Sequence, residues 1–150
     1  MNALDNLMVL EPQLVARLTE QLADLSPKVH VLAAADLAGV TEATQVTPAV
    51  HVVYQNYRVV ESRSDGKASR IEQSWLTIIA TKNVKDTRSG AAARAEAGLI
   101  AARVAKALMG FKPEAASKPL HLVQGPGAAF SNGFAYLPLA FVAELTLSVN

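Results

Sequence analysis

Two long runs of β-branched and aromatic residues, separated by a short polar turn, dominate the hydrophobic pattern of the chain. Both runs lie within 47–81, and the turn between them contains an Asp-Gly pair at 65–66. This succession predicts a β-hairpin. Its inner half, at 50–54 and 75–79, is apolar on both faces and is expected to be buried on two sides. Its outer half, at 58–70, is mostly polar and is expected to project beyond the core.

Strict alternation assigns the side chains of a strand to its two faces. Along the first hairpin strand, Val52 and Tyr54 are expected on one face, and Val53 and Tyr57 on the other. The closing segment, 134–149, alternates without a break, so one of its faces is expected on the core and the other is expected to be half exposed.

Two segments have the period of amphipathic helices. The first, 11–25, opens at Pro12 and carries a leucine stripe, and the second, 90–109, ends before Gly110. The second helix has a large apolar stripe that can cover the sheet. It also has a stripe of small side chains, which permits close approach either by the first helix or by a neighbouring subunit. The large stripe is Ala93, Ala97, Ile100, Ala101, Val104 and Leu108, and the small stripe is Ala95, Gly98, Ala102 and Ala105.

The order of the remaining elements favours an α+β fold. Short strands are predicted at 29–32 and 120–123, and the glycine-rich stretch 124–133 is expected to be a long loop. We expect a two-layer sandwich, in which two main helices pack on one face of a mostly antiparallel sheet of four to five strands. The length fits one domain over 1–150.

The composition adds one feature to this picture, a low content of charged residues. Of the 150 residues, 51% are hydrophobic and 18% are charged, against about a quarter in ordinary soluble domains. Part of the surface is therefore expected to be covered by a partner, unless the value only reflects a chain rich in alanine. The net charge is +1 and no basic stripe stands out, which argues against sequence-specific nucleic-acid binding.

No residue pattern points to catalysis, a cofactor or a metal. The chain has no cysteine, which excludes disulfides and thiol chemistry. His30, His51 and His121 lie in strand patterns without metal-ligand spacing, and a structural role is expected for each. The stretch 125–127 (Gly-Pro-Gly) is not followed by Lys-Ser/Thr and a helix, so we interpret it as a loop that docks on a partner. No apolar run reaches the roughly 18 residues of a membrane span, so a cytoplasmic location is expected.

Several stretches occur in an order that resembles one known family. In chain order they are the leucine-striped helix, 48–54 (Pro-Ala-Val-His-Val-Val-Tyr), 73–78 (Gln-Ser-Trp-Leu-Thr-Ile) leading to Lys82-Asn83, the Ala/Gly helix with Arg94 and Gly98, 107–113 (Ala-Leu-Met-Gly-Phe-Lys-Pro), and 136–141 (Tyr-Leu-Pro-Leu-Ala-Phe). From about Leu14 to Val149, the chain resembles the tail terminator proteins of tailed bacteriophages, especially those of Mu-like contractile-tailed phages.

The resemblance implies a structural virion protein and not an enzyme. Tail terminators of this kind are small α+β proteins that form a hexameric ring on the head-proximal end of the tail tube. The ring stops tube polymerisation and forms the surface for joining the head. The implied partners are other copies of the chain, the tail tube protein, a head-completion or connector protein and the tail sheath protein. The implied location is the virion tail, assembled in the cytoplasm of the bacterial host, with the genome passing through the pore.

Candidate contact residues follow from this resemblance and from the position of exposed polar segments. The outer half of the hairpin and the 82–89 loop are expected to contact the tube, the pore or a neighbouring subunit, although a solvated tip with weak cross-strand ion pairs has the same pattern. The outer strip of the second helix and the 124–133 loop are expected to contact a subunit or the head side. The first group is Arg58, Arg63, Asp65, Lys67, Arg70, Lys85 and Arg88, and the second group is Leu99, Arg103, Lys106 and Phe130.

Two other functions fit the same sequence. One is another phage head–tail joining or tail-completion protein of similar size. The other is a small α+β enzyme whose site forms at a subunit boundary, which requires a pocket with convergent polar groups.

Overall fold

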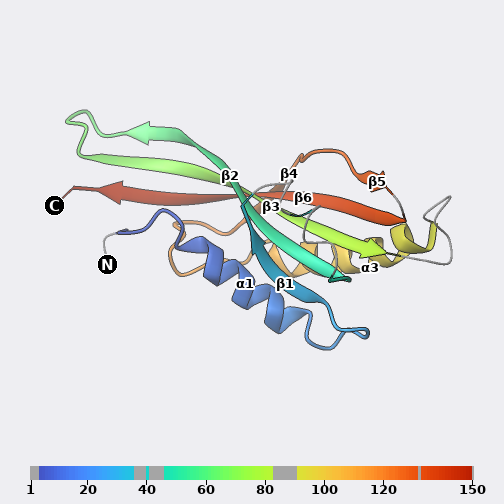
Figure 1. The fold of residues 1–150 in the computed structure, drawn as a ribbon. Helices are drawn as coiled ribbons and strands as arrows, with labels where there is room; N and C mark the ends of the chain where they lie inside the picture. The colour runs from blue at the N-terminus through green and yellow to red at the C-terminus, as the bar shows by residue number, and fades with distance from the viewer. Residues whose placement is uncertain (1–3, 36–39, 41–45, 83–90, 132, 150) are drawn as a thin grey trace.

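The computed structural model describes residues 4–35, 40, 46–82, 91–131 and 133–149 (Figure 1). Two helices and six strands follow one another along these described residues. Their bounds are α1 Leu10–Gln21, β1 His30–Ala34, β2 Ala49–Ser62, β3 Ala68–Lys82, α3 Ala91–Leu108, β4 His121–Val123, β5 Ala129–Ser131 and β6 Phe134–Ser148. The predicted α+β class is confirmed.

The strands form one open sheet in the order β1-β2-β3-β6-β4, and β5 pairs with the start of β6. All neighbours are antiparallel except β1 and β2, which are parallel. The sheet has six strands where four to five were expected. The additional strand is β5, which lies inside the glycine-rich stretch 124–133 and folds back on residues 134–136. A three-residue strand is too short to leave a period in the sequence.

Both helices pack on one face of the sheet, and the main core lies between the two layers. The leucine stripe of α1 is buried at Leu10, Leu14 and Leu18, and the large stripe of α3 is buried as predicted. Two arginines join the helices to each other. Arg17 Nε donates to the carbonyl oxygen of Ala107 at 3.0 Å, and Arg103 Nη2 donates to that of Gln21 at 2.9 Å.

A second, smaller core lies on the opposite face, over the inner half of the sheet. It contains apolar side chains of β2, β3 and β6, among them Val53, Ile78 and Tyr136. The loop after β4 approaches this face closely, because a Cβ added at Gly125 would lie 3.0 Å from the Cβ of Ala140. The expectation that the inner half of the hairpin is buried on two sides is therefore confirmed.

A buried glutamine ties the N-terminal segment to the sheet. Gln73 is fully buried, and its Nε2 donates to the carbonyl oxygen of Leu7 at 2.7 Å. Its Oε1 accepts a hydrogen bond from Trp75 Nε1 at 3.1 Å. Since both ends of the amide are bonded, the polar group is accommodated in the core at little cost.

The face assignment along β2 is wrong beyond Tyr54, because the strand contains a β-bulge. Tyr54 lies opposite Trp75, but Asn56 lies opposite Ser74, so Gln55 has no partner on β3. One extra residue reverses the alternation that follows it. Tyr57 therefore lies opposite Gln73 and shares the face of Tyr54, the face on which the helices pack.

Candidate functional site

The outer parts of β2, β3 and β6 extend beyond the helices as a three-stranded arm (Figure 1). We define the arm as residues 56–74 and 142–149. β1 pairs with β2 only up to Val53, whereas β6 accompanies β3 to the end of the sheet, where Ser148 lies opposite Ala68. The hairpin is thus not a free two-stranded tip, because the C-terminal strand supports it along its whole length.

The turn at the end of the arm is ordered by its own polar groups. Gly66 has a φ of +74°, in the left-handed region that favours glycine, and its N–H donates to the carbonyl oxygen of Arg63. Asp65 accepts from Arg63 Nε at 2.7 Å and from the backbone N–H of Lys67 at 3.0 Å. The hydrogen bond from Arg63, and then that from Lys67, lowers the pKa of Asp65. At the same end, the N–H of Val149 donates to the carbonyl oxygen of Lys67 at 2.8 Å.

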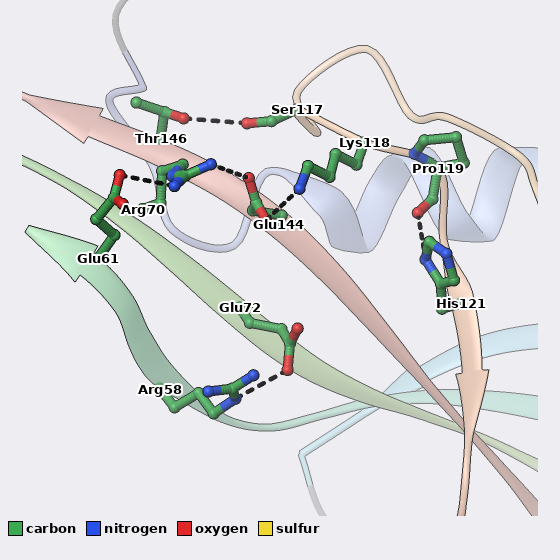
Figure 2. A network of polar contacts seen from close by, with 10 residues as sticks. All are labelled: Arg58, Glu61, Arg70, Glu72, Ser117, Lys118, Pro119, His121, Glu144 and Thr146. Carbon is green, nitrogen blue, oxygen red and sulfur yellow. Dashed lines mark hydrogen bonds and ion pairs between the residues drawn. The ribbon is translucent and has the colours of Figure 1, made fainter.

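One face of the arm carries a network of ion pairs, shown in Figure 2. Arg58 binds Glu72 at 3.0 Å, and Arg70 binds Glu61 at 2.6 Å. Glu144 lies between Arg70 at 3.8 Å and Lys118 at 3.4 Å, and only 12% of its side chain is exposed. Charges from β2, β3, β6 and the segment before β4 therefore hold the strands of the arm together.

The free edge of the arm, along β2, carries exposed apolar side chains. All residues of β2 from 55 to 62 are exposed, and they include three large apolar side chains. Tyr57 is 53% exposed, Val59 is 54% exposed and Val60 is 40% exposed. These residues were not among the predicted contacts, because the segment was interpreted from its charges. The signal was present in the sequence, as an apolar residue on either side of Arg58.

The structure places five of the predicted tube-side residues on the arm. Arg58 and Arg70 belong to the ion-pair network, and Arg63, Asp65 and Lys67 form the turn. Lys85 and Arg88 lie outside the described residues. The structure thus brings the first group together at one end of the sheet, as far as it is described.

In the second predicted group, some side chains are exposed and others contact residues of the same chain. Leu99 is 74% exposed and Lys106 is also exposed, both on the outer side of α3. Arg103 instead binds within the chain, to Gln21 and to the carboxylate of Asp24, and this hydrogen bond lowers the pKa of Asp24. Phe130 lies on β5, with the guanidinium of Arg94 above its ring at 5.9 Å from the centroid.

Among the residues that the structure describes, no helix covers most of the small stripe of α3. Ala95, Gly98 and Ala102 are exposed, and no atom lies within 4 Å of the position of a Cβ on Gly98. Of the two occupants considered for this stripe, the first helix is therefore excluded. With Leu99 and Met109, which is 54% exposed, the stripe forms an outward surface that is mainly apolar.

His51 and His121 differ in burial and in hydrogen bonding. His51 is buried on the face of the smaller core, neither ring nitrogen has a hydrogen-bond partner among the described residues, and burial lowers its pKa. His121 is exposed, and its Nδ1 lies 3.0 Å from the carbonyl oxygen of Pro119. In the described part of the chain, no three His, Asp or Glu side chains are placed to hold a metal ion. None of its helices is long and apolar enough to cross a membrane.

A hollow of about 270 Å³ lies beside the ion-pair network. The carboxylates that line it already form ion pairs within the chain. Of its lining residues, Glu72 is bound by Arg58, and Glu144 by Arg70 and Lys118. The hollow therefore presents paired charges rather than free groups that converge on a substrate.

Comparison with known proteins identifies the family of the chain. None of the curated proteins matches the chain. The family model described as "Phage tail terminator protein" matches residues 5–149, which is almost the whole sequence and includes the arm, both helices and every strand. The chain therefore belongs to the phage tail terminator protein family, whose members are structural proteins of the phage tail.

Proposed function

We propose that this protein caps the head-proximal end of the phage tail tube as a ring, stops tube polymerisation and forms the surface for joining the head. The observation that supports this most directly is the presence of two separate exposed apolar surfaces. One is the free edge of the arm at Tyr57, Val59 and Val60, and the other is the outer surface of α3 around Leu99 and Met109.

Two different surfaces on one chain are what a closed ring needs. In a head-to-tail ring, each subunit contacts the next through unlike patches, and rotation closes the series. We propose that six copies close in this way, with the outer surface of α3 at the subunit boundary. The exposed glycine and alanines of that surface permit close approach of a neighbouring backbone.

The same asymmetry explains how growth would stop. A tail tube elongates because each added ring exposes a surface that the next ring binds. A terminator binds that end through one surface and presents an unlike surface beyond it. We propose that the arm, with its turn at 63–67, faces the tube or the neighbouring subunit. The remaining partners would be the head-completion or connector protein and, in a contractile tail, the sheath.

Tail length in a phage that lacks this gene tests the proposal. We expect overlong tails without heads by negative-stain electron microscopy, and normal length after complementation with the intact gene. Tails of normal length that fail to join heads would instead identify a tail-completion protein. Normal virions would contradict both roles and would direct attention to the enzyme alternative.

Complementation with variants connects the phenotype to the structure. Leu99→Asp places a charge on the outer surface of α3, where no contact within the chain depends on the side chain, and is expected to give overlong tails. Lys112→Asp, at another exposed position outside both surfaces, is the matched control and is expected to restore normal length.

A further inference from the structure

The outer half of β2 is an open strand edge. β1 covers β2 only at Ala49–Val53, so the strand from 55 to 62 has β3 on one side and, among the residues that the structure describes, no strand on the other. Figure 1 shows this part of β2 leaving β1 and running along the rim of the arm. Its N–H and C=O groups that point away from β3 are available for pairing.

The opposite rim of the arm is occupied at Glu144 and Thr146, in contrast to the β2 edge. On β6, the carbonyl oxygen of Glu144 accepts from the N–H of Ser117 at 2.7 Å, and Thr146 Oγ1 lies 3.1 Å from Ser117 Oγ. The segment before β4 thus occupies that rim, and Lys118 adds an ion pair to it.

The open edge has β-bulges on either side of 56–59, but it has no proline and no lysine. Such edges are commonly protected by proline, by free lysines or by a covering loop. Here the two charged residues, Arg58 and Glu61, are bound to β3, and the exposed side chains between and beside them are Tyr57, Val59 and Val60. The edge therefore has no net charge and presents three large apolar side chains among polar ones, which disfavours nucleic acid as its occupant.

Two bulges set the length of strand that fits. The register is regular only from Asn56, opposite Ser74, to Val59, opposite Ile71, and shifts on either side of this segment. Within it, Tyr57 and Val59 share one face and Arg58 lies on the other. A matching strand would carry apolar residues at alternate positions and pair over about four residues.

We propose that the outer edge of β2 binds an extended segment of another polypeptide, which adds a strand to the arm. A symmetric pair of edges from two copies of this chain would join only four regular residues and three apolar side chains from each copy. A contact through so few residues needs further surface to reach the roughly 1,200 Å² of buried area in a stable interface. A flexible strand from a different chain needs no such area at the edge alone, because the rest of that chain can bind elsewhere.

Photo-crosslinking in phage-producing cells tests the partner. A p-benzoylphenylalanine at position 57 of the full-length protein should crosslink to a segment of another protein, which mass spectrometry of the linked peptide then locates. The expected segment has apolar residues at alternate positions. Crosslinks to a second copy of this chain, or yields no higher than those from the same probe at Lys112, would overturn the proposal.

Hydrogen exchange distinguishes strand pairing from contact through side chains. Outward-facing amides within 56–60 should exchange at least roughly tenfold more slowly in the isolated complex than in the free protein. Unchanged exchange in a complex that contains the crosslinked segment would also overturn the proposal. The ring and the tube cap are judged separately, by tail length, so failure of either idea is distinguishable from failure of the other.

A double substitution at the β2 edge and a control substitution on β4 complete the test. With the probe at position 57, Val59→Lys plus Val60→Lys should remove the crosslink, because lysines on an edge oppose strand addition. Leu122→Lys, which alters a similarly exposed apolar side chain on β4, should leave the crosslink intact. Equal loss with both variants would contradict a site at the β2 edge, and circular dichroism would confirm that both remain folded.

Discussion

Glu72 and Glu144 lie directly opposite each other on β3 and β6, and three basic side chains neutralise the pair. Arg58 binds the first carboxylate, and Arg70 and Lys118 bind the second. Like charges at directly opposite positions destabilise a sheet, so the arm depends on these basic residues to remain extended.

Removal of the two cations around Glu144 should destabilise the protein. The variant Arg70→Met plus Lys118→Met is expected to lose about 1–2 kcal/mol, because a mostly buried carboxylate keeps its charge without partners. The free energy of unfolding in urea at low salt measures the loss. Addition of Glu144→Gln should restore most of it, and Lys112→Met should have little effect. A loss of the same size with and without Glu144→Gln would contradict the ion-pair explanation.

His51 should make stability depend on pH on the acid side. Burial lowers its pKa in the folded state, so the unfolded chain binds the proton first as the pH falls. The lowered pKa therefore has no effect on stability well above the unfolded pKa of about 6.5, and stability is lost as the pH falls below that value, by up to about 1.4 kcal/mol per pH unit.

Urea unfolding of His51→Leu between pH 7.5 and pH 5 measures this contribution. The variant should lose the histidine-dependent slope, and it should gain stability at neutral pH because two unpartnered ring nitrogens are removed. His121→Gln, at an exposed site, is the control and should keep the slope of the unaltered protein. An identical slope in all three proteins would show that His51 is not the titrating group.

Gln73 should be important for docking of the N-terminal segment. Gln73→Leu leaves the carbonyl oxygen of Leu7 and the Nε1 of Trp75 without their partner, and is expected to cost about 2–3 kcal/mol. Limited proteolysis should show faster cleavage near residue 7. A second change, Trp75→Phe, removes the unpaired Nε1 group. It should therefore destabilise the Gln73→Leu variant less than it destabilises the unaltered protein. Full additivity would argue against the shared hydrogen bond.

Variants of Arg103 and Leu99, which lie four residues apart on α3, should affect different properties. The first should lower stability, and the second should impair assembly. Arg103→Ala removes contacts to the end of α1 and should lower the melting temperature of the isolated protein. Leu99→Asp should leave that temperature nearly unchanged and reduce ring formation, measured by light scattering or on tail tubes. If Leu99→Asp assembled normally, the outer surface of α3 would not be a subunit boundary.

The helices and the long strands were predictable because their periods are long and regular. The leucine stripe of α1 and the alternation along β6 each repeat over several turns or residue pairs, so the pattern exceeds chance. The bulge at Gln55 could not be predicted, because it depends on how β2 meets β3 and leaves no mark in composition. One residue of slippage was enough to move Tyr57 to the other face.

The contact surfaces were predictable only in part. Charge correctly marked the segment that became the arm, but it drew attention to Arg58 and Arg70, which bind within the chain, and away from Tyr57 and Val59. On α3, periodicity identified a stripe of small residues without indicating what covers it. The position of α1 excludes that helix as the occupant, and position is a property of the tertiary structure.

The antiparallel pairing of β3 with β6 has a mechanical consequence. The two strands remain in register over their whole length, from Ala68 opposite Ser148 to Lys82 opposite Phe134. A pull between the arm and the far end of the sheet runs along these strands and loads their hydrogen bonds in shear. Because bonds in shear share the force and must fail together, the long axis is the stiff direction of this subunit, and a tensile force would be carried from one end to the other.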